Sequence, residues 1–144
     1  MPKAKAPRQP VPLERDVQAQ MRVWLVAHGC VVHRRSVAGA RKMPDGSVMT
    51  LGQTGQADLW GKLPDGRHFE LEVKRPGNRP TQAQVDWLTA MNGRGRDRSV
   101  AFWADSLADV EQVFRRVMDG WRVVYDHNPR PGDYRLEAPT RDAP

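Results

Sequence analysis

The clearest pattern along the chain is a strict alternation of apolar and charged residues over Phe69–Lys74 (Phe-Glu-Leu-Glu-Val-Lys). A period of two is typical of a β-strand with one buried face. A Pro-Asp-Gly turn at 64–66 stands just before this segment. We therefore predict a β-hairpin formed by Ala57–Lys62 and Arg67–Lys74.

Apolar residues with a helical period predict three further segments. A first helix is expected over about Leu13–Ala27, a second over about Gln82–Asn92, and a third from the N-cap Ser106 to about Asp119. A glycine follows each segment, which is typical of a helix end. Runs of β-branched and aromatic residues predict additional strands at Cys30–Ser36, Ser99–Ala104 and Trp121–Tyr125.

The order helix, strand, hairpin, helix, strand, helix predicts an α/β fold, a single small domain with a mixed central β-sheet flanked by helices. We place this domain at residues 13–125. Residues 1–12 are basic and rich in proline, which predicts a disordered arm. Residues 126–144 form a C-terminal tail in which proline, glycine and charge dominate, and no element is predicted there.

Charge narrows the range of partners. The 144 residues include 23 Lys and Arg against 17 Asp and Glu, a net charge of +6, which favours a polyanionic partner. The single cysteine, Cys30, precludes an internal disulfide and is expected to be a buried thiol. No apolar run is long enough to span a bilayer and no signal-peptide pattern follows Met1, so we expect a soluble cytoplasmic protein without a membrane partner.

The predicted hairpin brings candidate chemistry together. Glu72 and Lys74 lie on the same side of the second strand, about 6.5–7 Å apart, and the turn folds Asp58 back beside them. Two carboxylates and an ammonium suit a metal-dependent phosphodiesterase, because Mg²⁺ prefers oxygen ligands and a lysine can assist the attacking water or the phosphate. Glu70 shares the same strand face and is the alternative ligand. We favour Glu72 because Lys74 follows it by two residues.

Several short motifs, in this order, resemble the VRR-NUC branch of the PD-(D/E)XK nuclease superfamily. The motifs are Glu14-Arg15-Asp16-Val17-Gln18, the basic strand and small-residue loop Val32–Ala40, Gly55-Gln56-Ala57-Asp58, Glu72-Val73-Lys74, and the glutamine-bearing segment Thr81–Leu88. The match covers about Leu13–Trp103. Ser36 stands where asparagine is common, and Ala57 stands where proline is common, but neither difference removes a metal ligand.

This resemblance implies a restriction-endonuclease-like α-β-β-β-α-β core and a Mg²⁺-dependent DNA endonuclease acting on branched DNA, such as a flap or four-way junction. It also implies a homodimer, and small stand-alone members of this kind suit a phage or mobile element. RNA remains open as a substrate. The alternatives are a catalytically inactive nucleic-acid-binding module on a nuclease fold, and an interaction protein whose charge serves only solubility.

By the same resemblance, each motif has an expected role. Asp58 and Glu72 would bind Mg²⁺ or Mn²⁺ with the Val73 carbonyl, Lys74 would activate or orient the water, Glu14 would complete the outer metal shell, and Gln84 would hold Lys74 or the water. Two of these roles have plain structural alternatives. Glu14 lies in a first helical turn, where an acid favours the helix dipole. Gln84 forms a capping-box pattern with Thr81.

Basic residues in the loops are expected to form a phosphate-binding rim. The residues assigned to nucleic-acid binding are Arg34, Arg35, Arg41, Lys42, Arg75 and Arg79, and a further basic cluster follows at Arg94, Arg96 and Arg98. A solvated surface is the alternative explanation for such charge. The histidines have no metal-ligand spacing and are expected to be solvated or structural. The five tryptophans are expected to pack in the core rather than to stack on bases.

Overall fold

The computed structural model describes residues 10–35, 40–50, 55–94, 98–126 and 129–140. Its centre is a four-stranded sheet in the order β1-β4-β5-β6. The strands are β1 (Val31–Arg34), β4 (Leu59–Lys62), β5 (His68–Val73) and β6 (Ser99–Ala104). β4 runs antiparallel to β1 and β5, whereas β5 and β6 are parallel, so the predicted mixed sheet is confirmed.

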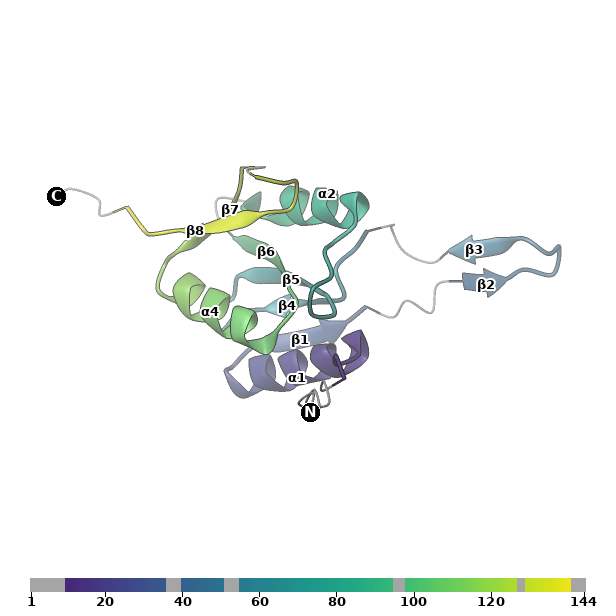
Figure 1. The fold of residues 1–144 in the computed structure, drawn as a ribbon, viewed down its shortest axis with the longest axis horizontal. Helices are drawn as coiled ribbons and strands as arrows, with labels where there is room; N and C mark the ends of the chain where they lie inside the picture. Colours follow the sequence, from purple (N-terminus) through teal and green to yellow (C-terminus); the bar gives the residue numbers. More distant parts are fainter. Residues whose placement is uncertain (1–9, 36–39, 51–54, 95–97, 127–128, 141–144) are drawn as a thin grey trace, which may run out of the picture.

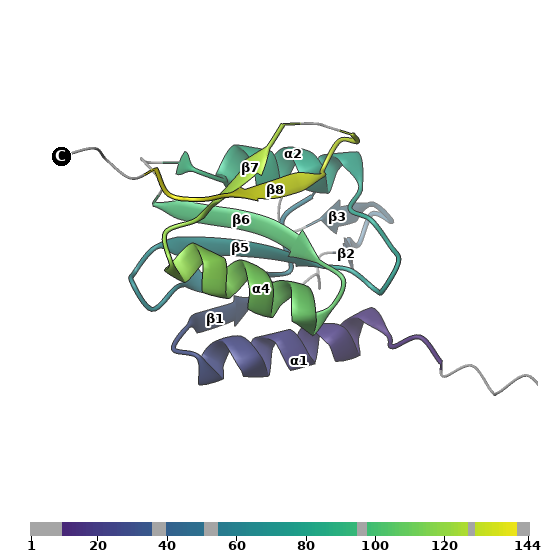
Figure 2. The same ribbon diagram turned by 60° about the vertical axis from the view of Figure 1, so that its left-hand side comes forward.

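Helices cover both faces of this sheet. α1 (Glu14–Ala27) and α4 (Leu107–Met118) lie together on one face, in front of the strands in Figure 2, and contribute to the main hydrophobic core. α2 (Gln82–Met91) packs on the other face, mainly against β6 and β5, in a smaller apolar cluster. None of the helices within the described ranges is long and apolar enough to cross a bilayer.

Alternation along β5 sends its side chains to these two different environments. Leu71 and its neighbours at 69 and 73 belong to the main core under α1 and α4. Glu70 and Glu72 face the α2 side, and they are only 0% and 1% exposed. The expectation of a strand with one solvated face is therefore wrong: β5 is a central strand, and α2 with the side chains around it covers the acidic face.

A second hairpin interrupts the predicted order between β1 and β4. β2 (Ala40–Lys42) and β3 (Val48–Thr50) pair antiparallel and stand away from the four-stranded sheet (Figure 1). At their turn, the Asp45 carboxylate accepts a 2.9 Å hydrogen bond from the Ser47 amide, which is a common role of aspartate in turns. The sequence predicted only a loop here, because strands of three residues carry too short an alternation to recognise.

The outer edge of β6 is covered by a small sheet of β7 (Arg122–Tyr125) and β8 (Tyr134–Glu137). The hydroxyls of Tyr125 and Tyr134 each donate a 2.8 Å hydrogen bond to β6, to the carbonyls of Ala101 and Trp103. The Asn92 side chain accepts a 3.2 Å bond from the Ala101 amide. β6 thus ends the sheet without an open edge, and β8, which the sequence did not predict, supplies part of that cover.

Candidate active site

Asp58, Glu72 and Lys74 meet on the α2 side of the sheet. The register pairs Leu59 with Leu71, which brings Asp58, one residue before β4, opposite Glu72. The Val73 amide donates a 3.0 Å hydrogen bond to Asp58 Oδ2, and Lys74 Nζ lies 3.4 Å from Glu72 Oε1. The hairpin therefore gathers the two carboxylates and the ammonium as its pattern predicted.

The two oxygens of the Glu72 carboxylate have different surroundings. Oε1 accepts a 2.8 Å hydrogen bond from Gln84 Nε2 and also faces Lys74. Oε2 is buried and has no hydrogen-bond partner in the part of the chain that the structure describes. A buried acceptor without a partner is costly, by about 1–3 kcal/mol, and is uncommon in folded proteins. Glu72 therefore has one oxygen held by protein and one able to accept a further ligand.

The surroundings of both carboxyl groups disfavour their ionised form. Burial, followed by the neighbouring charge of Asp58, raises the pKa of Glu72 to about 8, although Lys74 opposes the shift. Burial also raises the pKa of Asp58, against the opposing effects of the Val73 amide, the Glu72 carboxyl and the positive charges of Lys74 and Arg34. Two carboxylates this close favour either a proton or a cation between them.

Glu70 is fully engaged within the protein. Arg35 Nη2 donates a 2.9 Å hydrogen bond to Glu70 Oε1, and its Nη1 donates to Oε2. His68 Nε2 lies 3.2 Å from the same Oε1. Between the two candidate ligands, Glu70 has both oxygens paired and Glu72 has one unpaired, which favours Glu72 as the metal ligand.

Arg35 is directed into the structure rather than toward solvent. Its guanidinium binds Glu70 and donates a 3.0 Å bond to the Ala57 carbonyl. It also lies over two indole rings, 5.6 Å from the centre of Trp60 and 5.4 Å from that of Trp87. Buried Glu70 requires a positive partner, and Arg35 provides it. The Arg35 guanidinium is therefore occupied within the protein, whereas the sequence had placed it in a phosphate-binding rim.

Gln84 links the start of α2 to the site. Its side-chain oxygen accepts a 2.9 Å bond from the Thr81 amide, and its own amide donates a 3.3 Å bond to Thr81 Oγ1. This capping box is complete, while Gln84 Nε2 simultaneously binds Glu72. The capping-box explanation for Gln84 is confirmed, whereas its partner in the site is Glu72 rather than Lys74, and a role in holding the attacking water stays a prediction.

Glu14 stands apart from this arrangement. It opens α1, in the first turn, and is partly exposed. No hydrogen bond or ion pair joins it to Asp58, Glu72 or Lys74 within the described part of the chain. Its role in an outer metal shell stays a prediction.

Comparison with known proteins places this geometry in a known fold. No protein-family model matches the chain, and no curated protein matches it in sequence. A solved structure described as a "VRR_NUC domain" matches with a TM-score of 0.53 and 23% identity, over 71% of this chain and 94% of that one. The chain has the fold of a VRR-NUC domain. The predicted resemblance and α/β class are thereby confirmed at the level of the fold, and the β2–β3 hairpin is an insertion in the predicted core order.

Within this fold, the acidic pair offers oxygen donors of the kind that a divalent metal ion binds. The described residues contain no group of three or more His, Cys, Asp or Glu side chains arranged around a common metal position. Mg²⁺ does not need such a group, because it keeps several waters and binds through one or two carboxylates. Asp58, Glu72 and the Val73 carbonyl fit that pattern, and the unpaired Glu72 Oε2 supplies the open oxygen.

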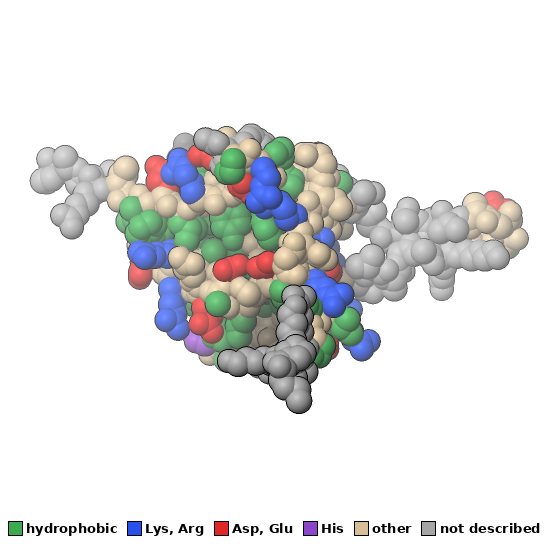
Figure 3. Space-filling model, viewed as in Figure 1, with side chains coloured by type: hydrophobic (Ala, Val, Ile, Leu, Met, Phe, Trp, Pro, Cys, Tyr) green, Lys and Arg blue, Asp and Glu red, His purple; other side chains and the backbone are tan. Residues whose placement is uncertain are grey.

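The other predicted basic residues have varied surroundings. Arg34 is exposed and near enough to Asp58 for its charge to lower that pKa. Arg75 donates a 3.3 Å bond to the Val11 carbonyl, and Arg79 binds Asp133 at 2.6 Å. The backbone of Arg41 and Lys42 lies on β2, but their side chains fall outside the described residues, as does Arg96. Figure 3 shows Lys and Arg spread over this view around a group of acidic side chains, rather than in one continuous patch.

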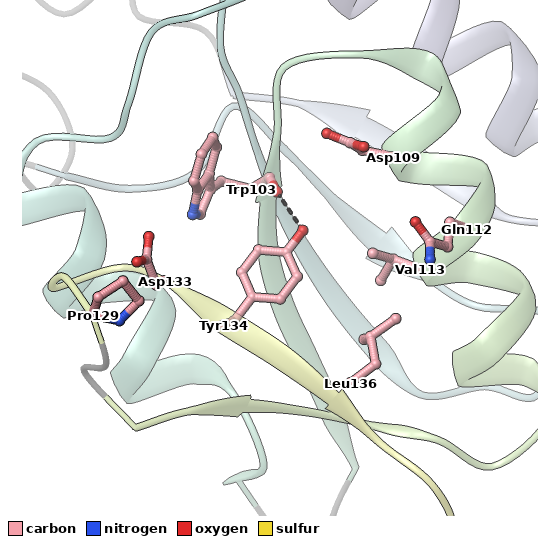
Figure 4. Close-up of a pocket in the computed structure, with 8 residues that line it drawn as sticks. All are labelled: Trp103, Asp109, Gln112, Val113, Pro129, Asp133, Tyr134 and Leu136. Carbon is pink, nitrogen blue, oxygen red and sulfur yellow. Dashed lines mark hydrogen bonds between the residues drawn. The ribbon is translucent and has the colours of Figure 1, made fainter.

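A hollow of about 470 Å³ lies beside β6, between α4 and β8 (Figure 4). It is lined by Trp103, Asp109, Gln112, Val113, Pro129, Asp133, Tyr134 and Leu136. Neither Asp58 nor Glu72 reaches it. Tyr134 crosses this hollow to bond the Trp103 carbonyl, so we attribute it to the packing of β8 against the edge strand.

Proposed function

We propose that this chain is a metal-dependent nuclease that hydrolyses phosphodiester bonds in DNA. The observation that carries the proposal is the pair of Asp58 and buried Glu72, which has one unpaired carboxylate oxygen, on Glu72, and an adjacent Lys74. A structural ion pair alone would not need a second carboxylate beside Glu72, where the two groups raise the cost of ionisation. The VRR-NUC fold supports the same conclusion.

The protein groups would divide the work as follows. Asp58, Glu72 and the Val73 carbonyl would hold Mg²⁺ or Mn²⁺, which supplies positive charge against the scissile phosphate when bound. The Val73 amide binds Asp58 Oδ2, and the Gln84 side chain binds Glu72 Oε1. These two hydrogen bonds fix the orientation of the carboxylates. Lys74 supplies a second positive charge and an N–H donor, able to orient the attacking water or offset charge on the phosphate.

The finer assignment of substrate rests on the resemblance to VRR-NUC nucleases. It favours branched DNA, such as a flap or four-way junction, and a homodimer that cuts two strands. The net charge of +6 supports a polyanionic substrate of either nucleic-acid type. RNA is therefore included among the substrates to be tested.

The deciding experiment offers labelled single-stranded, duplex, flap and four-way-junction DNA, and matching RNA, to purified protein with Mg²⁺, Mn²⁺ or EDTA. We expect cutting that needs metal and is abolished in Lys74→Ala. Arg115→Ala, at an exposed position of α4, is the control for loss of a positive charge and should cut like the wild type. Binding without cutting in every metal would instead support an inactive nucleic-acid-binding module, and light scattering of the same sample reports whether the chain is a dimer.

A further inference from the structure

On the acidic side of the sheet, the helices within the described ranges leave the part formed by β1 and β4 largely uncovered. α2 packs on β6 and β5, while the main contacts of β1 are with α1 and β4. The side chains that alternate to this face from β1, β4 and β5 form what we call the open face. Its members are Val31, His33, Trp60, Lys62 and His68. Val31, on this face, is 54% exposed, so the start of β1 is not covered by the described residues.

Aromatic rings are already aligned on the open face. His33 and Trp60 are cross-strand neighbours whose ring centres lie 4.5 Å apart at 30°. His68 lies 6.1 Å from Trp60 on the other side. Trp60 is only partly buried and His33 is exposed. Trp60 packs against its neighbours as predicted, although it lies outside the two apolar clusters, and the exposed ring of His33 is held against it by stacking.

The open face continues into a basic groove of about 570 Å³. Lys62 and His68 belong to both, and the groove is further lined by Arg67, Arg94, Arg98, Asp65, Gly66, Met91 and Ser99. Arg67 is paired with Asp65 at 2.7 Å. Lys62 and Arg98 have no ion pair with any residue that the structure describes, so their charges are available to an anion.

The groove lies on the same side of β5 as the candidate active site. His68 and Glu72 are four positions apart along β5, which corresponds to about 13 Å. Trp60, opposite Glu70 in the register, lies between them. The Glu72 carboxylate, the Trp60 ring and the basic groove therefore lie on the same side of the sheet. A few nucleotides can span the distance between Glu72 and the groove.

We propose that the open face binds an unpaired nucleic-acid strand, stacking a base on the exposed ring of His33, which Trp60 supports, and holding its phosphates in the groove at Lys62 and Arg98. Base stacking on aromatic rings beside a positively charged groove is the recognised way to bind single strands. A duplex would offer only phosphates, because its bases already stack on one another. The inference rests on the proposed nuclease and specifies its substrate: nucleic acid with a single-stranded arm next to the cleavage point.

The test measures binding in EDTA, so that no cutting occurs, by fluorescence anisotropy with labelled single-stranded and duplex oligonucleotides. We expect His33→Ala to weaken single-strand binding about tenfold and to leave duplex binding within about twofold. Lys62→Gln and Arg98→Gln should each lower the slope of log K against log salt by about 0.7. Arg115→Gln, on α4 across the sheet, is the charge-matched control and should leave both unchanged.

The melting temperature of each variant shows whether a change in binding reflects a change in folding. His33 and Lys62 are both exposed, so we expect their substitutions to leave the melting temperature nearly unchanged. Equal effects of His33→Ala on single strands and duplex, or Lys62→Gln behaving like Arg115→Gln, would overturn the open face as a binding surface. The two proposals fail separately. Selective strand binding without cutting would refute the nuclease alone, whereas cutting with unaltered binding by the variants would refute the open face alone.

Discussion

Gln84 donates a 2.8 Å hydrogen bond to Glu72 while its side-chain oxygen accepts the amide of Thr81. One side chain thus fixes both the start of α2 and a carboxylate of the candidate site. Partners of this kind, which orient a metal ligand without touching the metal, commonly change metal affinity or activity 10–100-fold when removed.

Comparing two variants of this capping box separates its structural and functional parts. Gln84→Ala removes both bonds, so we expect about 1 kcal/mol loss of stability and a roughly tenfold loss of metal affinity. Thr81→Ala removes only the hydroxyl cap, so we expect a similar loss of stability with metal affinity retained. Urea unfolding and calorimetric titration with Mn²⁺ measure the two quantities. Equal loss of metal affinity in both variants would show that Gln84 acts only through the helix.

The raised pKa of Glu72 predicts a pH-dependent stability in the absence of metal. The folded state holds a proton on Glu72 up to its raised pKa of about 8, whereas the ordinary pKa of a glutamate is about 4.5. The associated stability is complete below about pH 4.5 and is lost as the pH rises through about 8. We therefore expect the free energy of unfolding in EDTA to fall between pH 5 and 8 more steeply in the wild type than in Glu72→Gln, which does not titrate.

Urea unfolding at several pH values, with the two proteins side by side, measures this difference together with the linked change at Asp58, because titrating groups distant from the pair cancel. Adding Mg²⁺ should stabilise the wild type most at the alkaline end, since ligand binding to the folded state adds stability and requires the ionised carboxylates. Parallel stability curves for wild type and Glu72→Gln would contradict the raised pKa.

The Arg35–Glu70 pair is predicted to support the fold rather than the substrate. Removing one partner leaves a buried charge, so Arg35→Leu should cost about 3–5 kcal/mol. The double variant Arg35→Leu with Glu70→Leu should be more stable than Arg35→Leu alone, because no charge remains buried. Arg34→Leu is the neighbouring control: Arg34 is exposed, and its loss should change stability by less than about 0.5 kcal/mol. A double variant less stable than Arg35→Leu would refute this interpretation.

Arg35 also shows where sequence patterns stop being informative. Periodicity predicted α1, β5, β6 and α4 to within a few residues, because each buries a regular face. It also placed Asp58 beside Glu72, since a hairpin turn fixes the register. The pairing of Arg35 with Glu70 joins β1 to β5 across β4, and no local signal marks a contact between segments so distant in the chain.

The same limit applies to burial. The charged residues of β5 resembled a solvated face, and only the packing of α2 and Arg35 shows that Glu70 and Glu72 are enclosed. That enclosure raises the pKa of Glu72 and leaves its Oε2 unpaired, so the chemistry of the site depends on tertiary packing. β8 was missed for a related reason: its four residues are held by β7 and by hydroxyl bonds to β6, rather than by a recognisable pattern of their own.

The cover over β6 provides a last prediction. Tyr134→Phe keeps the ring but leaves the Trp103 carbonyl without the hydroxyl donor, which should cost about 1–3 kcal/mol. Tyr125→Phe should have a similar effect through Ala101.

Ending the chain at residue 126 removes β8 and should destabilise the protein more than either single change, whereas ending it at residue 140 should not. Because Trp103 is the register partner of Glu72 but its carbonyl bond lies at the outer edge, we expect Tyr134→Phe to retain Mn²⁺ affinity while losing stability to urea. Full stability after removal of β8 would show that β6 does not need this cover.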